Sequence, residues 1–541
     1  MDLGTSHARP GGRPPGCDGV TSGPPGDSPS ASVTSGQRVA RNVLYGAAGQ
    51  LWSLILLVIT IPIVVRGLGE SAYGVFVLVS VLLSYVAFLD LGLTPAVVRS
   101  IAVHYAAGDD ERLSRVAGTA LSLLLALGIL GAALLAWLAP FIVHSVLNVP
   151  PELSEAARIV LDITAVGFAC NMILTLSGAI PQGLQRLDLF TVRTVVLTTA
   201  NAAVQIAAVK LGGGLIWVAG LTVAVNVASL LLFVVVARQL LPGVSFRPRL
   251  DRWALRELGS FGLMRFLNQG SGQVVFQLDR LIIAAFLPIR AVTLYSVPLS
   301  IAQKFTTVQL IFSGAFFPAA SELHSVQETE RLRRLYISSL KLSLVMVLPL
   351  VVLVAAFARP LLSTWVGPDF GSASAKILVV LAIAYGLATV VGVPALASDA
   401  TGHAHWTAGF ALLSAAINLS LTLLLVPRLG PIGAAYALLI NAATQGMVFV
   451  YVVQRWFIKV GLATILRRAI LRPLAAAVLP ALYGVALAPH LGSFTAVLAA
   501  ILAGGLLFAV MTILLGVWDE QELGVARATA RQVVARVFKA A

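Results

Sequence analysis

Long apolar runs, separated by short polar segments, recur along the chain from about residue 42 to residue 516. A helix needs about 20 apolar residues to cross a hydrocarbon layer of about 30 Å. Runs of this length are too long for strands. The pattern predicts fourteen membrane-spanning helices, at 42–65, 72–94, 116–139, 156–178, 190–210, 215–237, 259–287, 293–318, 337–358, 374–397, 406–426, 432–454, 473–488 and 494–516. The thirteenth run is short and contains Pro480, so a chain of twelve spans is the alternative.

Composition supports this interpretation. Of the 541 residues, 58% are hydrophobic and 11% are charged, and the mean hydropathy is +0.93. Soluble domains carry about 25% charged residues, so a soluble enzyme, a DNA-binding module and a disordered scaffold are excluded. We therefore expect an all-α polytopic membrane protein. The net charge of +14 reflects loops rich in Lys and Arg on one side of the membrane, and no nucleic-acid partner is expected.

The distribution of basic residues predicts the orientation of the chain. With the N-terminus inside, most Lys and Arg residues fall in the inner loops and in both tails, for example in 247–256, 331–334 and 467–472. The outer loops and adjoining span ends hold seven, namely Arg66, Arg158, Lys210, Arg290, Arg359, Lys376 and Arg428. This asymmetry predicts a multi-pass protein of the cytoplasmic membrane with both termini in the cytoplasm. The ends of the bundle are called inner and outer in this sense below.

Landmarks of the first half recur in the second half at offsets of 215 to 222 residues. Tyr73 matches Tyr295, Asn201 matches Asn418, and Asn226 matches Asn441. Spans 1–6 and 7–12 are therefore two copies of one six-helix unit, related by a pseudo-twofold axis along the membrane normal. The expected organisation is a disordered Gly/Pro/Ser-rich cytoplasmic tail at 1–37, an N-lobe at 38–240, a basic cytoplasmic linker at 241–258, a C-lobe at 259–458, two extra helices within 459–516, and a basic amphipathic tail at 517–541.

Several segments carry a resemblance to a known family. The segments LGESAYGVFVL (68–78) and FLDLGLTPAVVR (88–99) resemble the N-terminal signature of polysaccharide-type flippases. QLDRLIIAAFLP (277–288), LYSVP (294–298) and LGPIGAAYA (429–437) are similar to signatures of their second half. Such O-antigen and exopolysaccharide (Wzx-like) flippases belong to the multidrug/oligosaccharidyl-lipid/polysaccharide (MOP) exporter superfamily. The resemblance covers about residues 38–516.

The resemblance implies two lobes in a V shape and an alternating-access flippase for undecaprenyl-diphosphate-linked oligosaccharides in cell-surface polysaccharide biosynthesis. The lipid-linked glycan, the bilayer and other polysaccharide-assembly proteins would be its partners. No cofactor is expected, although a proton or sodium gradient could drive the cycle. An ion-coupled multidrug or metabolite exporter of the same superfamily and a transport-inactive membrane scaffold remain alternatives.

Charged and amide residues inside predicted spans are the candidate substrate-binding groups, because such residues are costly in hydrocarbon unless they face a cavity or a partner. They are Arg265, Gln269, Gln273, Gln277, Arg280 and Lys304. Arg and Lys can neutralise a diphosphate, and a stripe of amides can bind sugars or neighbouring helices. For Asp279 the sequence favours a structural ion pair with Lys304 or Arg280.

Two further pairs are candidate gates. Asp90 and Arg99 flank the inner end of the second span, where they could form a loop cap or a gate salt bridge. Arg158 and Asp162 are four residues apart near the outer end of the fourth span. That spacing predicts a local ion pair, with an outer gate or a cation-coupling site as the alternative.

Motifs of enzymes and metal sites are missing from the sequence. It contains no P-loop, no H-E-x-x-H and no G-x-S-x-G. Cys17 and Cys170 offer neither a disulfide framework nor metal-ligand spacing. The outer loops are too short for a catalytic domain. We therefore expect neither an enzyme nor a metal site.

Overall fold

The computed structural model describes residues 31–86, 90, 92–143, 148–313 and 316–519. Within these ranges the side chains of 31–45, 47, 85–86, 261, 263–276 and 309–313 lie outside the description. The chain divides after Leu44 into two compact units, Met1–Leu44 and Tyr45–Ala541. All contacts discussed below lie within the second unit.

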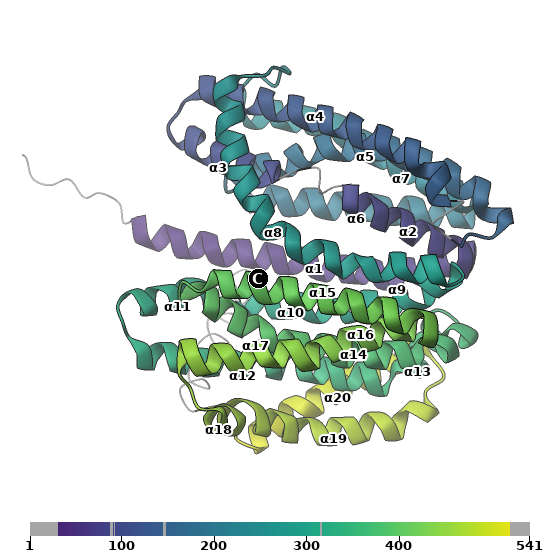
Figure 1. The fold of residues 1–541 in the computed structure, drawn as a ribbon, viewed down its shortest axis with the longest axis vertical. Helices are drawn as coiled ribbons and strands as arrows, with labels where there is room; N and C mark the ends of the chain where they lie inside the picture. Colours follow the sequence, from purple (N-terminus) through teal and green to yellow (C-terminus); the bar gives the residue numbers. More distant parts are fainter. Residues whose placement is uncertain (1–30, 87–89, 91, 144–147, 314–315, 520–541) are drawn as a thin grey trace, which may run out of the picture. The chain divides into compact units, whose positions relative to one another are not determined.

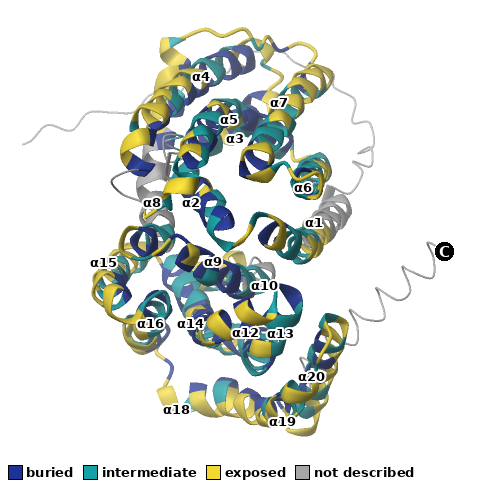
Figure 2. Ribbon diagram, turned by 90° about the vertical axis from the view of Figure 1, so that its right-hand side faces the viewer, coloured by how far each residue is buried: buried dark blue, intermediate teal, exposed yellow. Residues whose placement is uncertain are grey.

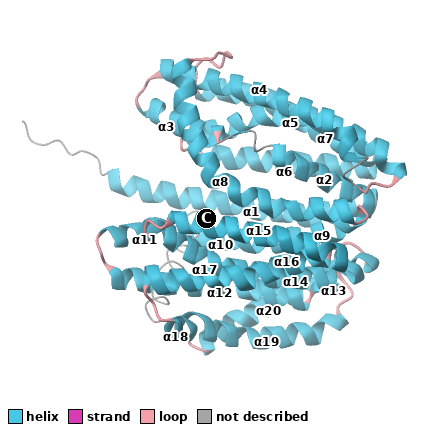
Figure 3. Cartoon of the chain, in the orientation of Figure 1, coloured by secondary structure: helices cyan, strands magenta, loops and turns pink. Residues whose placement is uncertain are grey.

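The described residues form helices joined by short loops, with no strand among them (Figures 1 and 3). The first half contains α1 (Ala31–Leu68), α2 (Glu70–Val86), α3 (Leu93–Ala106), α4 (Asp110–Phe141), α5 (Pro151–Gly183), α6 (Leu187–Lys210) and α7 (Gly214–Leu240). The second half contains α8 (Arg252–Phe286), α9 (Arg290–Ala302), α10 (Lys304–Ser313), α11 (Phe316–Ser325), α12 (Thr329–Ala356), α13 (Ala358–Trp365), α14 (Pro368–Ala400), α15 (Ala404–Leu429) and α16 (Ile432–Asn441), continued by η3 (Ala442–Gly446), α17 (Met447–Val452) and η4 (Val453–Ile458). The C-terminal part contains α18 (Leu462–Ile465), η5 (Leu466–Ile470), α19 (Leu471–Leu487), η6 (Ala488–His490) and α20 (Phe494–Leu514).

Eleven helical stretches of the described chain are long and apolar enough to cross a membrane, and the shorter helix Glu70–Ser84 is also apolar. The exact count of fourteen spans stays a prediction. Figure 2 shows exposed residues along α19 and α20, and large apolar side chains such as Leu502 and Leu506 are each 70% exposed. Apolar surface of this extent is what a lipid-facing helix presents.

Two of the predicted spans contain an irregular point within the described residues. In the span predicted at 72–94, α2 is described as far as Val86, and α3 starts at Leu93 after Gly92, whose left-handed φ of 75° favours glycine. The span predicted at 293–318 is interrupted at Gln303, between α9 and α10. Pro298 inside α9 lacks a backbone N–H and so weakens that helix before this point. Both irregular points lie in the second predicted span of their half, and Gln303 keeps helical dihedral angles (φ −59°, ψ −24°).

The buried apolar residues show where the halves join. One core combines outer parts of both halves, including Val64 and Leu78 of the first with Val292 and Leu378 of the second. Toward the inner end the cores are separate. One contains α3, α4 and α5 of the first half, and another contains α11, α12 and α14 of the second. Among the described residues, the cores of the two halves merge at the outer end, and at the inner end only the first turns of α8 pack into the core of the first half.

Helix α8 connects these cores. Ala254 and Leu258 of its first turns belong to the inner core of the first half, whereas Ile283 belongs to the shared outer core. Glu257 fixes the inner part of α8 to α3 by accepting from Ser100 Oγ at 2.7 Å and by pairing with His104 Nε2 at 3.2 Å.

The segment predicted as a linker, 241–258, lies against α4. The backbone N–H of Ser245 donates to Ser114 Oγ at 2.9 Å. A Cβ on Gly118 would lie 2.6 Å from the carbonyl oxygen of Arg247, so this close approach requires glycine. The first turns of α8 are thereby attached to the first half of the chain.

The two C-terminal membrane helices pack on α12, outside the duplicated halves. A Cβ on Gly484 of α19 would lie 2.7 Å from Ala356 Cβ, and one on Gly504 of α20 would lie 2.5 Å from Leu353 Cδ2. Small residues let membrane helices approach closely. These contacts make α12 the attachment site of the α19–α20 pair.

We expect Glu257→Ala to destabilise the protein, because it leaves the buried Ser100 and His104 without their partner. Unsatisfied buried polar groups cost about 1–3 kcal/mol. Glu111→Ala is the matched control, since it removes only an exposed ion pair with Arg115, worth about 0.2–1 kcal/mol. Thermal unfolding in detergent should show a clearly larger loss of Tm for Glu257→Ala. Equal losses would contradict the proposed attachment of α8.

Candidate functional site

The two halves are hydrogen-bonded to each other at the outer end. Arg66, in the last turn of α1, donates from Nε to the carbonyl oxygen of Val366 at 2.7 Å and from Nη2 to that of Trp365 at 2.9 Å. In return, Trp365 Nε1 donates to the carbonyl oxygen of Val58 at 2.7 Å. Each half thus provides both donors and backbone acceptors.

A second set of outer contacts joins the starts of α2 and α9. Glu70 forms an ion pair with Arg290, and Thr293 Oγ1 donates to the carbonyl oxygen of Glu70 at 2.6 Å. A Cβ on Gly74 would lie 2.6 Å from the carbonyl oxygen of Ile289. We call Arg66, Glu70, Arg290, Thr293 and Trp365 the outer cluster. Together with the shared core, it closes the outer end of the interface between the halves.

The buried carboxylate of Asp279 is the centre of a polar network within the second half. Asp279 is 2% exposed and lies about 10 Å from the outer end of α8 at about 1.5 Å per residue. It accepts from Tyr295 Oη at 2.9 Å, Thr422 Oγ1 at 3.1 Å and Asn418 Nδ2 at 3.3 Å. The predicted ion pair of Asp279 with Lys304 or Arg280 is wrong, since neutral donors from α9 and α15 satisfy the carboxylate.

Arg280 and Lys304 form no ion pair within 4.0 Å in the described part of the chain, although Arg280 interacts electrostatically with the neighbouring Asp279. Arg280 is half-buried, its Nη1 donates to Gln277 Oε1 at 3.4 Å, and its buried Nε has no hydrogen-bond partner. It interacts electrostatically with the hydroxyl of Tyr73 on α2, which places it near the first half. Lys304 is half-buried at the start of α10, directly after the irregular point at Gln303.

These features are consistent with a site for an external anion. A buried guanidinium N–H without an acceptor is costly, and a bound anion would satisfy it. Gln277, half-buried beside Arg280, adds an amide. The side chains of Arg265, Gln269 and Gln273 lie outside the described residues, so their predicted roles rest on the sequence alone.

The candidate gate residues behave differently from one another. The carboxylate of Asp90 accepts from the N–H of Thr94 at 3.3 Å and from its hydroxyl at 3.1 Å. These contacts match the capping alternative. The predicted ion pair between Arg158 and Asp162 is wrong, because Arg158 is exposed and the two side chains form no pair within 4.0 Å.

The outer cluster was not among the predicted gates, although the sequence contains a signal for it. Glu70 and Arg290 are separated by 220 residues, which falls in the range of 215 to 222 residues between matching landmarks of the two halves. Equivalent positions near a twofold axis face each other, and Arg290 lies two residues from Val292, the equivalent of Glu70 at the offset of 222 set by Tyr73 and Tyr295, so a contact between these opposite charges is predicted. Applying this rule to the repeat would have found the pair.

Metal-site geometry is not seen. No group of three or more His, Cys, Asp or Glu residues that could hold a metal ion occurs in the part of the chain that was searched.

Residues 39–324, more than half of the chain, match the family of polysaccharide biosynthesis proteins. The chain belongs to this family. It is 24% identical over 400 residues to the "Putative O-antigen transporter" of Shigella flexneri, an alignment that covers 73% of this chain and 93% of the relative.

Solved structures show the same fold. The lipid II flippase MurJ in an inward closed conformation matches with a TM-score of 0.67 at 13% identity, covering 87% of this chain and 98% of that one. An inward-facing multidrug resistance MATE family transporter of the MOP superfamily matches with a TM-score of 0.65 at 18% identity, covering 76% of this chain and 95% of that one. The prediction of an all-α polytopic membrane protein with a MOP-type fold is confirmed.

We expect Gly74→Val to prevent closure of the outer end, because its side chain would overlap the backbone of Ile289. Spin labels at Arg158→Cys and Lys376→Cys, in a Cys17→Ala/Cys170→Ala background, would report the distance between equivalent exposed positions of the two halves. Gly74→Val should lengthen this distance in electron–electron double resonance. Gly220→Val is the control, since nothing lies within 4 Å of a Cβ at Gly220. Identical distance distributions for both variants would contradict the assignment.

Proposed function

We propose that the protein is a flippase that moves undecaprenyl-diphosphate-linked oligosaccharide across the cytoplasmic membrane by alternating access, for cell-surface polysaccharide biosynthesis. The observation that carries this proposal is the pair of half-buried cations, Arg280 and Lys304, which form no ion pair within 4.0 Å in the described residues. Membership of the polysaccharide biosynthesis family supports it, as does the relation to a protein named for O-antigen transport.

The substrate follows from the sign of these charges. A lipid diphosphate is a compact anion that Arg and Lys bind through charge-assisted hydrogen bonds. A site for a cationic drug would instead need an acid exposed to the substrate, whereas Asp279 is 2% exposed and enclosed by Tyr295, Asn418 and Thr422. The glycan would follow the diphosphate, with amides such as Gln277 within its reach, while the lipid tail stays in the bilayer.

The cycle follows from the contacts between the halves. With the outer cluster closed and the inner cores separate, the head group would enter from the cytoplasmic side, where both termini are expected. Release outside requires breaking the Glu70–Arg290 pair and the hydrogen bonds of Arg66. Exposed pairs of this kind are individually weak, which suits contacts that must open in every cycle.

We infer that the Asp279 network couples this cycle to a proton or sodium gradient. A carboxylate in a membrane interior is costly unless neutralised, and binding a cation would neutralise it. Asn418 Oδ1, beside the carboxylate, is a buried acceptor without a hydrogen-bond partner. Carboxylate, amide and hydroxyl oxygens are also the donors that hard cations prefer.

Translocation of an undecaprenyl-diphosphate oligosaccharide into proteoliposomes tests the proposed substrate site. We expect Arg280→Ala and Lys304→Ala each to slow translocation at least about tenfold, because a hydrogen bond to a charged group is worth about 1.5–3 kcal/mol. Arg280→Lys should retain more activity than Arg280→Ala. Arg158→Ala removes an exposed cation from the outer end and should have no effect.

Folding of each variant is checked by size-exclusion chromatography and thermal unfolding. Full activity of both alanine variants would contradict the cationic site. If the wild type moves no glycan lipid and exports organic cations, the protein is an exporter of the drug or metabolite class. Absence of any transport would favour a scaffold.

Asp279→Asn tests the coupling. It keeps a side chain of the same shape but cannot be neutralised by a cation, so translocation should become insensitive to imposed proton and sodium gradients. Tyr295→Phe, which removes one hydrogen bond and keeps the carboxylate, should preserve the response to the gradient. An unchanged gradient response in Asp279→Asn would refute the role of this network.

A further inference from the structure

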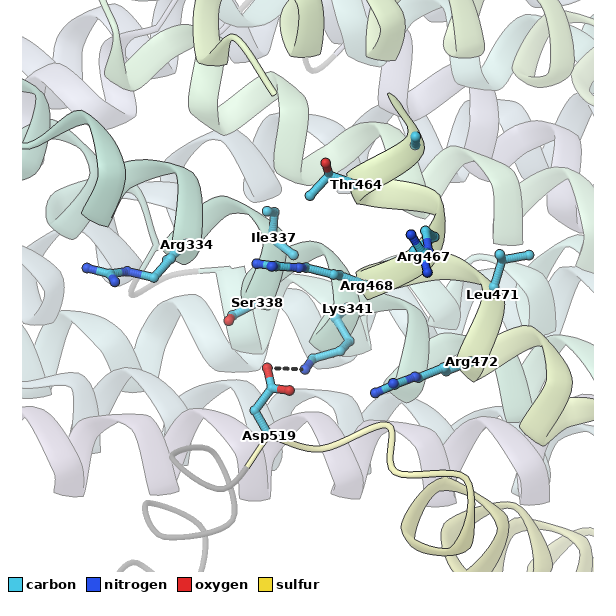
Figure 4. A pocket seen from close by; sticks show the side chains of 11 residues that line it. Arg334, Ile337, Ser338, Lys341, Thr464, Arg467, Arg468, Leu471, Arg472 and Asp519 are labelled. Carbon is cyan, nitrogen blue, oxygen red and sulfur yellow. Dashed lines mark hydrogen bonds and ion pairs between the residues drawn. The ribbon is translucent and has the colours of Figure 1, made fainter. Parts of the chain in front are cut away.

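A large basic pocket lies between α12 and the segment from α18 to the start of α19, at the inner end of the bundle. Its volume is about 1060 Å³. Arg334, Ile337, Ser338 and Lys341 line it from one face of α12 at helical spacing. Thr464, Arg467, Arg468, Leu471 and Arg472 line it from the opposite segment, and Asp519 adds the only carboxylate among the described lining residues (Figure 4).

The charges of the pocket are strongly unbalanced. Lys341 is 3% exposed, and its Nζ pairs with Asp519 Oδ2 at 3.2 Å. Arg472 donates to the carbonyl oxygen of Gly516 at 2.7 Å. Arg334, Arg467 and Arg468 have neither a hydrogen-bond acceptor nor a carboxylate within 4.0 Å in the described part of the chain.

The surroundings of the pocket are apolar. On the same short segment, Leu462 is 51% exposed, Leu466 is 37% exposed and Leu471 is 53% exposed. A stretch in which arginines alternate with exposed leucines at the end of a membrane helix lies at the interface between head groups and acyl chains. The pocket is therefore accessible from the inner aqueous phase and borders the lipid.

We propose that this pocket binds a phosphate group, carried by an anionic membrane lipid or by a soluble phosphate compound, at a site separate from the substrate site. The planar guanidinium group matches the geometry of phosphate oxygens and binds them in a bidentate manner. Basic pockets between membrane helices on the cytoplasmic side suit lipid head groups. The Lys341–Asp519 pair neutralises the inner wall and leaves the three arginines for the ligand.

This site is independent of the proposed translocation path. Arg280 and Lys304 lie on α8 and α10, whereas the pocket lies on α12 and on the segment preceding α19, which the duplicated halves do not include. Since α12 also carries the α19–α20 pair, a ligand here would link that pair to the second half. Failure of this proposal would leave the proposed function untouched.

The test uses the full chain in neutral phosphatidylcholine nanodiscs. Phosphatidylglycerol is added to the lipid in one arm, and inorganic pyrophosphate is added to the buffer in the other. Native mass spectrometry measures bound lipid, and isothermal titration calorimetry measures bound pyrophosphate. Arg467→Gln/Arg468→Gln changes one wall, and Arg334→Gln changes the other. Arg238→Gln/Arg256→Gln removes two exposed arginines of the inner end outside the pocket and is the control of equal charge.

We expect the wild type to bind at least one probe and the Arg467→Gln/Arg468→Gln variant to bind it about tenfold more weakly, as the loss of charge-assisted contacts requires. Arg334→Gln should weaken the binding of the same probe, whereas the Arg238→Gln/Arg256→Gln control should leave that binding unchanged. A loss confined to phosphatidylglycerol identifies a lipid head group, and a loss confined to pyrophosphate identifies a soluble ligand. The absence of binding to the wild type, or an equal loss in the control, overturns the proposal.

Discussion

The contacts at the outer end of the interface determine how the rest of the molecule is arranged. Arg66, the Glu70–Arg290 pair and the close approach of Gly74 to the backbone of Ile289 hold the halves together there. The apolar cores follow the same division, since they merge at the outer end and separate toward the inner end.

Asp279 and Arg280 are adjacent in sequence, yet their environments are opposite. The carboxylate is fully buried and receives three hydrogen bonds from neutral groups, whereas the guanidinium is half-buried with a donor left unsatisfied. A mutual ion pair would have neutralised both groups and removed the cation from any substrate. Tyr295, Asn418 and Thr422 prevent this by satisfying the acid separately. One helix can thus carry a closed polar network next to a cation that keeps an unsatisfied donor.

Much of the fold could be predicted from the sequence, because apolar runs, positive loops and a repeat are strong signals in membrane proteins. The irregular point at Gln303 was not predicted, because Gln303 and Lys304 are both good helix formers and only tertiary contacts decide where the helix distorts. The prediction of an ion pair between Arg158 and Asp162 is wrong because spacing within a helix does not determine which way exposed side chains turn. Lys341, within the predicted span 337–358, was overlooked although the rule for charged residues in spans applies to it.

The choice of acceptors for Arg66 has an evolutionary consequence. Its guanidinium binds the main-chain carbonyls of residues 364–366 and none of their side chains. Every amino acid supplies such a carbonyl, so positions 364 and 366 can drift without breaking the contact, provided that the turn keeps its path. Covariation between Arg66 and these positions is therefore not expected among relatives, and contact prediction from aligned sequences would overlook this link between the halves.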